Sequence, residues 1–195
     1  MLVCNCGGLI LGGGKSRRMG GIDKGCLLLD GKSFLQRVEE AMDFLPEKLY
    51  AGTGKSSFRS VYEAFAGCGP LGGIYAGLSV TRCDALFVAA CDTPLVTEAF
   101  VRFMMERAGE GLTISQTPDG RLQPLGAVYH RDCYNAIGQM LQNGERRLMG
   151  LMERVPVRVI PLAGTGFETV HFNVNTPEDL AKLRADEMLD NMGGF

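Results

Sequence analysis

The amino-acid sequence predicts an α/β fold with a mostly parallel sheet that is covered by helices on both faces. Short apolar runs alternate with segments of helical periodicity along the chain, which is the pattern of parallel sheets with helical connections. The clearest run, ALFVAA at residues 85–90, shows no polar alternation, as expected for a strand covered on both faces. Ligands in such folds bind at the carboxyl ends of the strands, so a site is expected at that edge.

Local signals along the chain predict the individual elements. Ser33 and Gln36 form an S-x-x-Q capping box before an apolar stripe at helical spacing, and Asp30 with Gly31 predicts a turn. Thr97 is expected to cap a helix that runs to about Ala108. Strands are expected at residues 8–11, 48–51, 85–90, 112–116, 124–129 and 156–161, and further helices at residues 56–66, 72–80, 132–142, 145–154 and from Pro177.

Size, charge and cysteine content limit the classes of function. The chain has 195 residues and a net charge of -2, which predicts one domain over residues 1–195 and does not favour nucleic-acid binding through bulk charge. It lacks both a run of about 18 apolar residues and the basic start of a signal peptide. The seven cysteines, partly inside apolar runs, are expected to be reduced. We therefore expect a cytoplasmic protein without nucleic-acid or membrane partners.

A glycine-rich stretch, LILGGGKSRRMGGIDKG at residues 9–25, follows the first predicted strand. A phosphate-binding P-loop would need glycine where Leu9 stands, and the dinucleotide fingerprint G-x-G-x-x-G would need glycine where Arg17 stands. What remains is a glycine turn that a phosphate or a base can approach closely, followed by Arg17, Arg18 and Lys24, which can neutralise a polyphosphate. The alternative is a solvated basic loop.

Asp92 follows the most apolar predicted strand, in the sequence VAACDTPLV. A carboxylate at the carboxyl end of a buried strand is well placed to bind Mg²⁺, because hard cations prefer oxygen ligands and bridge phosphates. The alternative for Asp92 is a helix-capping or turn aspartate. The sequence leaves these interpretations open.

Two further segments carry polar residues that local structure explains only in part. In FNVNTPEDLAKL, Thr176 and Pro177 suit a helix start, and the period of a strand puts Asn173 and Asn175 on one face. These asparagines are expected near the metal or an acceptor, or else they make ordinary turn hydrogen bonds. In NGERRLMGLMER, Arg146 and Arg147 could meet an anionic acceptor, or they form a solvated basic helix start.

The stretch L-G-G-G-x-S-x-R-M-G-x-x-D-K at residues 11–24 resembles the signature of nucleotidyltransferases that attach a nucleoside monophosphate to a phosphorylated acceptor. The later segments G-P-L-x-G, C-D-T-P, Q-P-L, G-E-R-R and N-V-N-T-P-E-D follow in an order that resembles the molybdenum cofactor guanylyltransferases. The resemblance spans nearly the whole chain. It implies a Rossmann-like α/β/α fold, GTP with Mg²⁺, and the terminal phosphate of molybdopterin as acceptor.

The resemblance also implies roles for residues of this chain. Lys24, Arg18 and Asp92 would be catalytic, with Asp92 as the metal ligand. The nucleotide would contact Leu11, Gly12, Gly13, Lys24, Gly52, Glu63 and Asp92, and the acceptor side would include Asn173, Asn175, Arg146 and Arg147. This chain departs from the family pattern at Gly12, where alanine is usual, near Gly52, where the family has asparagine, and at Glu63, the only acid near the place of a family aspartate.

The resemblance therefore predicts transfer of GMP from GTP to molybdopterin, with release of pyrophosphate. Transient contacts with other proteins of molybdenum cofactor synthesis are expected with it. Two alternatives remain open: the same chemistry with CTP or another phosphorylated acceptor, and a nucleotide-binding regulatory protein without turnover. Intact Lys24 and Asp92 favour the enzyme.

Overall fold

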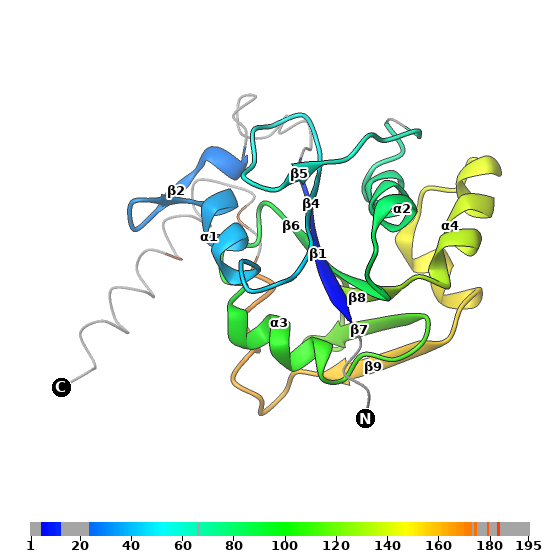
Figure 1. Ribbon diagram of the computed structural model, residues 1–195. Helices are drawn as coiled ribbons and strands as arrows, with labels where there is room; N and C mark the ends of the chain where they lie inside the picture. Colours follow the sequence, from blue (N-terminus) through cyan, green and yellow to red (C-terminus); the bar gives the residue numbers. More distant parts are fainter. Residues whose placement is uncertain are drawn as a thin grey trace.

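The computed structural model describes residues 5–12, 24–65, 67–172, 174, 179 and 183, with Lys24 described by its backbone alone. Its centre is a seven-stranded sheet in the order β5-β4-β1-β6-β8-β7-β9 (Figure 1). The strands are β1 Cys6–Leu11, β4 Lys48–Ala51, β5 Arg59–Ser60, β6 Ala85–Ala90, β7 Leu112–Gln116, β8 Leu122–His130 and β9 Val157–Pro161. A small hairpin, β2 Leu28–Leu29 with β3 Lys32–Ser33, stands apart from this sheet.

The sheet is mostly parallel, as the sequence predicts. Strands β5, β4, β1 and β6 run in one direction. Strand β8 lies antiparallel between β6 and β7, and β9 pairs in parallel with β7. Because only β8 is reversed within this sheet, the carboxyl ends of β4, β1 and β6 share one edge.

Helices cover both faces of the sheet and produce three layers. Helices α1 Phe34–Ala41 and α3 Glu98–Met105 lie on one face, and α2 Pro70–Val80 and α4 Cys133–Gln142 lie on the other. The first face is packed by Val38 and Phe100 against Phe87, and the second by Ile74 and Ile137 against Leu86. The Rossmann-like α/β/α prediction is confirmed.

Local chemistry explains where the helices begin and how closely they pack. The Ser33 hydroxyl accepts from the Gln36 backbone and the Gln36 side chain accepts from the Ser33 backbone, which is the predicted capping box. Thr97 caps α3 through its hydroxyl, which accepts a hydrogen bond from the Phe100 N–H. On α2, a Cβ added at Gly77 would lie 2.7 Å from Leu9 Cδ2, so glycine lets this helix lie directly on β1.

The structure corrects two predicted helices. Residues 56–66 form no helix over their described part, because Ser56 and Ser57 bind the Glu39 carboxylate and the chain then pairs with β4 as β5. The helix expected at 145–154 is the shorter 3₁₀ helix η3 Leu148–Glu153, because Arg147 adopts an extended backbone conformation directly before it. The helix expected from Pro177 lies mostly outside the described residues, although Asp179 and Leu183 are helical.

Two findings bear on membrane and redox expectations. No helix in the described ranges combines the length and the apolarity that a membrane span requires. Within the same ranges the cysteines are free thiols, and their reduced state stays a prediction.

Candidate functional site

Three strands end side by side at the predicted binding edge. The Gly12 N–H donates to the Ala51 carbonyl over 2.8 Å, and the Cys91 N–H donates to the Leu11 carbonyl over 3.1 Å. Parallel pairing therefore continues one residue beyond β1 on both sides. It brings Gly12, the start of the Asp92 turn and Gly52 into one row, as expected for a ligand site at the carboxyl ends of parallel strands.

Gly12 and Gly52 occupy positions with no room for a side chain. A Cβ at Gly12 would overlap the Tyr50 hydroxyl, and a Cβ at Gly52 would overlap the Gly12 carbonyl oxygen. The edge consequently presents bare backbone, which a phosphate or a base can approach closely. The alanine usual in the family pattern at residue 12 could not fit beside Tyr50, so the departure at this position has a packing reason.

Asp92 lies on a tight turn directly after β6. The Thr93 hydroxyl donates to the Ala90 carbonyl over 2.7 Å, and the Val96 N–H donates to the Thr93 carbonyl over 3.2 Å. Asp92 itself is partly exposed. Because Thr97 caps α3, Asp92 does not cap that helix, and its place on the turn agrees with both the metal-ligand and the turn interpretation.

The Asp92 carboxylate at this edge fits an open Mg²⁺ site. Within the described residues, no three His, Cys, Asp or Glu side chains gather in a cluster that could hold a metal ion. Mg²⁺ in nucleotide sites is commonly held by one or two carboxylates with substrate phosphates. Asp92 beside the bare backbone of Gly12 suits that arrangement, in which phosphate oxygens complete the coordination.

Glu63 lies above the same edge, next to the first turn of α2. A Cβ at Gly73 would lie 2.7 Å from Leu11 Cδ2, 3.2 Å from Ala51 Cβ and 3.8 Å from Glu63 Oε1. Gly73 therefore lets α2 approach the ends of β1 and β4 with the Glu63 carboxyl close by. Burial raises the pKa of that carboxyl, because a low-dielectric surrounding disfavours the charged form.

The remaining predicted residues fall into two groups. Arg146 and Arg147 are exposed in the segment between α4 and η3, while the neighbouring Glu145 pairs with Arg154 over 3.0 Å. The structure thus places these arginines on a segment separate from the Asp92 turn. Arg18, Gly13, Asn173 and Asn175 lie outside the described residues, as does the side chain of Lys24, whose backbone opens the 3₁₀ helix η2 Lys24–Cys26.

The structure adds a buried polar contact that the sequence did not indicate. His171 Nε2 and Ser115 Oγ share a hydrogen bond of 2.7 Å, and the imidazole packs edge-on against Phe100. Burial lowers the pKa of His171 to about 4. Gly126 on β8 lies against the ring, since a Cβ there would overlap His171 Cε1. This contact fixes the chain two residues before Asn173.

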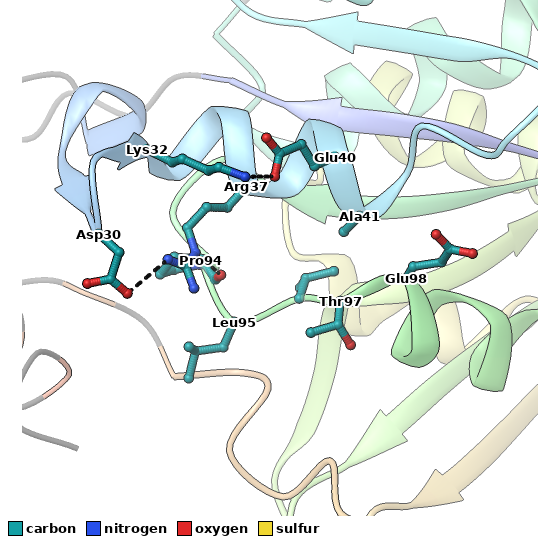
Figure 2. A pocket seen from close by; sticks show the side chains of 10 residues that line it. Asp30, Lys32, Arg37, Glu40, Ala41, Pro94, Leu95, Thr97 and Glu98 are labelled. Atoms are coloured by element: carbon teal, nitrogen blue, oxygen red, sulfur yellow. Dashed lines mark hydrogen bonds and ion pairs between the residues drawn. The ribbon is translucent and has the colours of Figure 1, made fainter. Parts of the chain in front are cut away.

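A surface pocket of about 520 Å³ lies beside the residues that follow Asp92. Its walls come from the β2–β3 hairpin, from α1 and from the segment that leads into α3 (Figure 2). Basic and acidic side chains alternate around it, and Lys32 pairs with Glu40 over 2.7 Å. The pocket therefore lies beside the strand-end site. Its mixed charges do not favour the binding of a polyphosphate.

Fold and site together define an α/β nucleotide-binding protein whose site is built from strand ends. Residues 8–158 match the family described as MobA-like NTP transferase domain. The chain therefore belongs to this family of nucleotidyltransferases.

Individual relatives agree over nearly the whole chain. It is 34% identical over 188 residues to a probable molybdenum cofactor guanylyltransferase of Pelotomaculum thermopropionicum, covering 91% of each chain. It is 30% identical to the molybdenum cofactor guanylyltransferase of Desulfosudis oleivorans, covering 91% of this chain and 94% of that one. Among solved structures, molybdopterin-guanine dinucleotide biosynthesis protein A from Archaeoglobus fulgidus matches with a TM-score of 0.78 and 25% identity, covering 94% of this chain and 98% of that chain.

Proposed function

We propose that this protein transfers GMP from GTP to the terminal phosphate of molybdopterin and releases pyrophosphate. The observation that carries the proposal is the strand-end site, in which the bare backbone of Gly12 and Gly52 adjoins the Asp92 turn. Relatives named molybdenum cofactor guanylyltransferase cover 91% of the chain and support this substrate pair.

The reaction is an in-line displacement at phosphorus. An oxygen of the acceptor phosphate forms a bond to the α-phosphorus of GTP, and the bond from that phosphorus to the bridging oxygen of the β-phosphate breaks. Pyrophosphate leaves with the electron pair. Because the acceptor oxygen is already anionic, no strong general base is needed, and positioning with charge stabilisation supplies the catalysis. Lys24 and Arg18 would stabilise the triphosphate and the developing charge.

Asp92 would hold Mg²⁺ together with phosphate oxygens of the nucleotide. When bound, the ion would neutralise negative charge on the phosphates and on the leaving pyrophosphate. The backbone of Leu11, Gly12 and Gly13 would contact the nucleotide beside it. These separate roles of side chain and backbone agree with the structure, because Asp92 lies on a hydrogen-bonded turn and the neighbouring strand ends at a glycine.

Guanine selection would depend on Gly52 and Glu63. Guanine presents two N–H donors on one edge, which a carboxylate can accept, whereas the corresponding edge of cytosine lacks that pair of donors. Glu63 stands above the strand ends in a partly buried position where the pKa of its carboxyl is raised, so a donor pair would stabilise its ionised form. At Gly52 the base would meet backbone groups, in place of the asparagine of the family pattern.

The acceptor would bind on the side of Asn173, Asn175, Arg146 and Arg147. The arginines are exposed and can meet an anionic acceptor, and His171 anchors the chain just before Asn173. Transient contacts with other proteins of molybdenum cofactor synthesis, and a cytoplasmic location, remain predictions.

The proposal is tested by following label from α-³²P-GTP in the presence of Mg²⁺ and purified molybdopterin. We expect radioactive label in a molybdopterin product, together with one pyrophosphate per product. A panel of unlabelled nucleoside triphosphates, scored by pyrophosphate release, addresses the alternatives. GTP binding without product would favour a regulatory protein, and product with a different phosphorylated acceptor alone would reject molybdopterin.

A further inference from the structure

Arg37 on α1 joins two loops that are far apart in the sequence. Its Nε donates to the Pro94 carbonyl over 3.2 Å, and its Nη1 donates to the Leu29 carbonyl over 3.4 Å. Figure 2 shows the side chain extending from α1 across the pocket floor toward Pro94. The Arg37 side chain is 23% exposed, so most of it is removed from water.

Each of these two carbonyls belongs to a segment that carries a predicted catalytic residue. Pro94 lies two residues after Asp92, on the turn that follows β6. Leu29 ends β2, the strand that follows the 3₁₀ helix opened by Lys24. The Phe34 N–H also donates to the Leu27 carbonyl over 2.9 Å. The first two turns of α1 thus connect the Lys24 segment with the Asp92 turn.

The guanidinium suits this role better than another cation would. Arginine presents several N–H donors in a fixed plane, so one side chain can bind two carbonyls in different directions. Hydrogen bonds from a charged donor are stronger than neutral ones. A lysine ammonium is a point charge on a flexible stem and offers no such fixed pair of directions.

The ion pair of Arg37 is a minor part of the arrangement. Asp30 Oδ2 lies 3.7 Å from Arg37 Nη1, and the Asp30 side chain is 64% exposed. Exposed ion pairs contribute little to stability. Asp30 also adopts a positive φ of 49° in the hairpin turn, which asparagine tolerates equally well. Asp30→Asn therefore removes the charge and leaves the turn intact.

We propose that Arg37 is a positioning residue for nucleotidyl transfer, which sets the distance between the Asp92 turn and the Lys24 segment through its bonds to Pro94 and Leu29. The proposal rests on the proposed function for its kinetic consequence. Arg37 lies on α1, on the face of the sheet opposite α2, and acts on the chemistry through these two carbonyls. Loss of the bonds leaves the Gly12 and Gly52 backbone in place.

The kinetic experiment compares Arg37→Met and Arg37→Lys with the wild type. We expect Arg37→Met to lower kcat by about 10- to 100-fold, because misplacement of catalytic groups by about 1 Å has effects of that size. The KM for GTP should change by less than about threefold, because backbone contacts of the nucleotide are kept. Arg37→Lys should recover only part of kcat. Equal kcat in Arg37→Met and wild type would overturn the proposal.

Arg102→Met is the matched control. Arg102 is also a helical arginine, pairs with Glu98 over 2.7 Å and stacks on Phe44, and neither of these partners belongs to the two loops. It should lower stability slightly and keep kcat, as should Asp30→Asn. An equal loss of kcat in Arg102→Met would show a general effect of helix packing and would overturn the assignment to Arg37.

Hydrogen–deuterium exchange of the substrate-free chain tests the same claim without catalysis. In Arg37→Met, peptides covering residues 24–29 and 91–96 should exchange faster, while peptides of β6 and α3 keep the wild-type rate. Uniformly faster exchange, or no change in both loops, would overturn the positioning role. The wild type could transfer no GMP while both loops still exchange faster in Arg37→Met. That result would reject the proposed function and leave the structural connection made by Arg37 supported.

Discussion

Strands β4, β1 and β6 meet at the carboxyl edge through backbone groups, whereas β7 and β8 pack against the buried side chain of His171. On the first side, Gly12 and Gly52 leave no room for a Cβ. On the second side, Ser115 of β7 binds His171, whose ring fills the space over Gly126 of β8. Glycine therefore makes room for a neighbouring group in both halves, namely the Tyr50 hydroxyl and the Gly12 carbonyl in the first and the His171 imidazole in the second. The halves differ because the first adjoins the Asp92 turn, whereas the second holds a buried side-chain hydrogen bond.

The difference separates two requirements of the proposed reaction. A nucleotide with its phosphates needs close approach to the backbone, which glycine allows. The other half holds the chain at His171 through a buried side-chain contact. Substitutions in the nucleotide half should therefore lower turnover first, and substitutions in the β7–β8 half should lower the free energy of unfolding first.

The largest effect is expected at Asp92. Asp92→Asn keeps the size of the side chain and removes its charge, so kcat should fall by about 10³-fold or more, in the range found for lost electrostatic stabilisation. The melting temperature should stay close to that of the wild type, because the turn is held by Thr93. Pyrophosphate release and thermal melting measure the two effects. Full turnover in Asp92→Asn would reject its role as metal ligand.

The next effect concerns pH and His171. Its pKa is about 4 in the folded chain and about 6.5 when unfolded. Between these two pH values the unfolded chain therefore binds more protons than the folded chain. The neutral, buried His171 contributes its full stability above the pKa of the unfolded state, and this stability is lost as the pH falls toward the pKa of the folded state. Between about pH 7 and pH 4 this group should reduce the free energy of unfolding by about 3 kcal/mol.

Urea unfolding at several pH values measures this effect against His171→Gln, which can bind Ser115 but does not titrate. The wild type should lose about 3 kcal/mol more than His171→Gln over that pH range. Ser115→Ala should keep the pH dependence while lowering stability at every pH. Parallel pH curves for the wild type and His171→Gln would show that His171 titrates normally.

An intermediate effect is expected where Gly12 meets Tyr50. Gly12→Ala should lower the free energy of unfolding by about 2 kcal/mol, because the new Cβ overlaps the Tyr50 ring, and it should lower turnover as well. Tyr50→Val removes the ring, so Gly12→Ala should cost less stability in that variant than in the wild type. This recovery, the coupling energy of the two substitutions, should be about 1–2 kcal/mol.

Gly52→Ala is the matched control for that coupling. Its Cβ would overlap the backbone carbonyl of Gly12, which no side-chain change relieves. Tyr50→Val should therefore add no recovery to Gly52→Ala. Equal recovery in both double variants would refute the specific overlap between Gly12 and Tyr50.

The smallest effect is expected at Tyr129, inside β8. Its hydroxyl donates to the Pro124 carbonyl over 2.8 Å, and burial raises the pKa of the phenol. Tyr129→Phe should cost about 1 kcal/mol of unfolding free energy through the lost hydrogen bond, with turnover unchanged. Chemical denaturation and a kcat measurement check both parts; a large loss of turnover at unchanged stability would break the division between the two halves.

Local signals predicted most of the fold. The bounds of β4, β6 and β7 agree with the predicted residues 48–51, 85–90 and 112–116, because apolar content and flanking turns fix a buried strand within a few residues. The capping box at Ser33 is likewise a pattern of four residues. The helix expected at 56–66 is wrong because pairing with β4 and the distant Glu39 decide that segment.

The site residues that belong to a sequence motif could be predicted, whereas contacts between residues distant in the sequence could not. Leu11, Gly12, Gly52 and Asp92 gather at one edge because three parallel strands end together. The contacts of Arg37 with Pro94 and of Ser115 with His171 join residues 57 and 56 positions apart. No spacing pattern marks such pairs, because they depend on the packing of α1 and β7 against later loops. The overlap of Gly12 with Tyr50 is hidden for the same reason.

In the proposed function, the backbone of Gly12 and Gly52, with Glu63, forms a site for a guanine nucleotide used in transfer to molybdopterin. The most direct measurement compares GTP and CTP turnover by the purified protein with molybdopterin and Mg²⁺. We expect pyrophosphate release with GTP to exceed release with CTP by about 100-fold or more, the range of discrimination that hydrogen-bonding sites reach. Equal turnover with both nucleotides, or a preference for CTP, would contradict it.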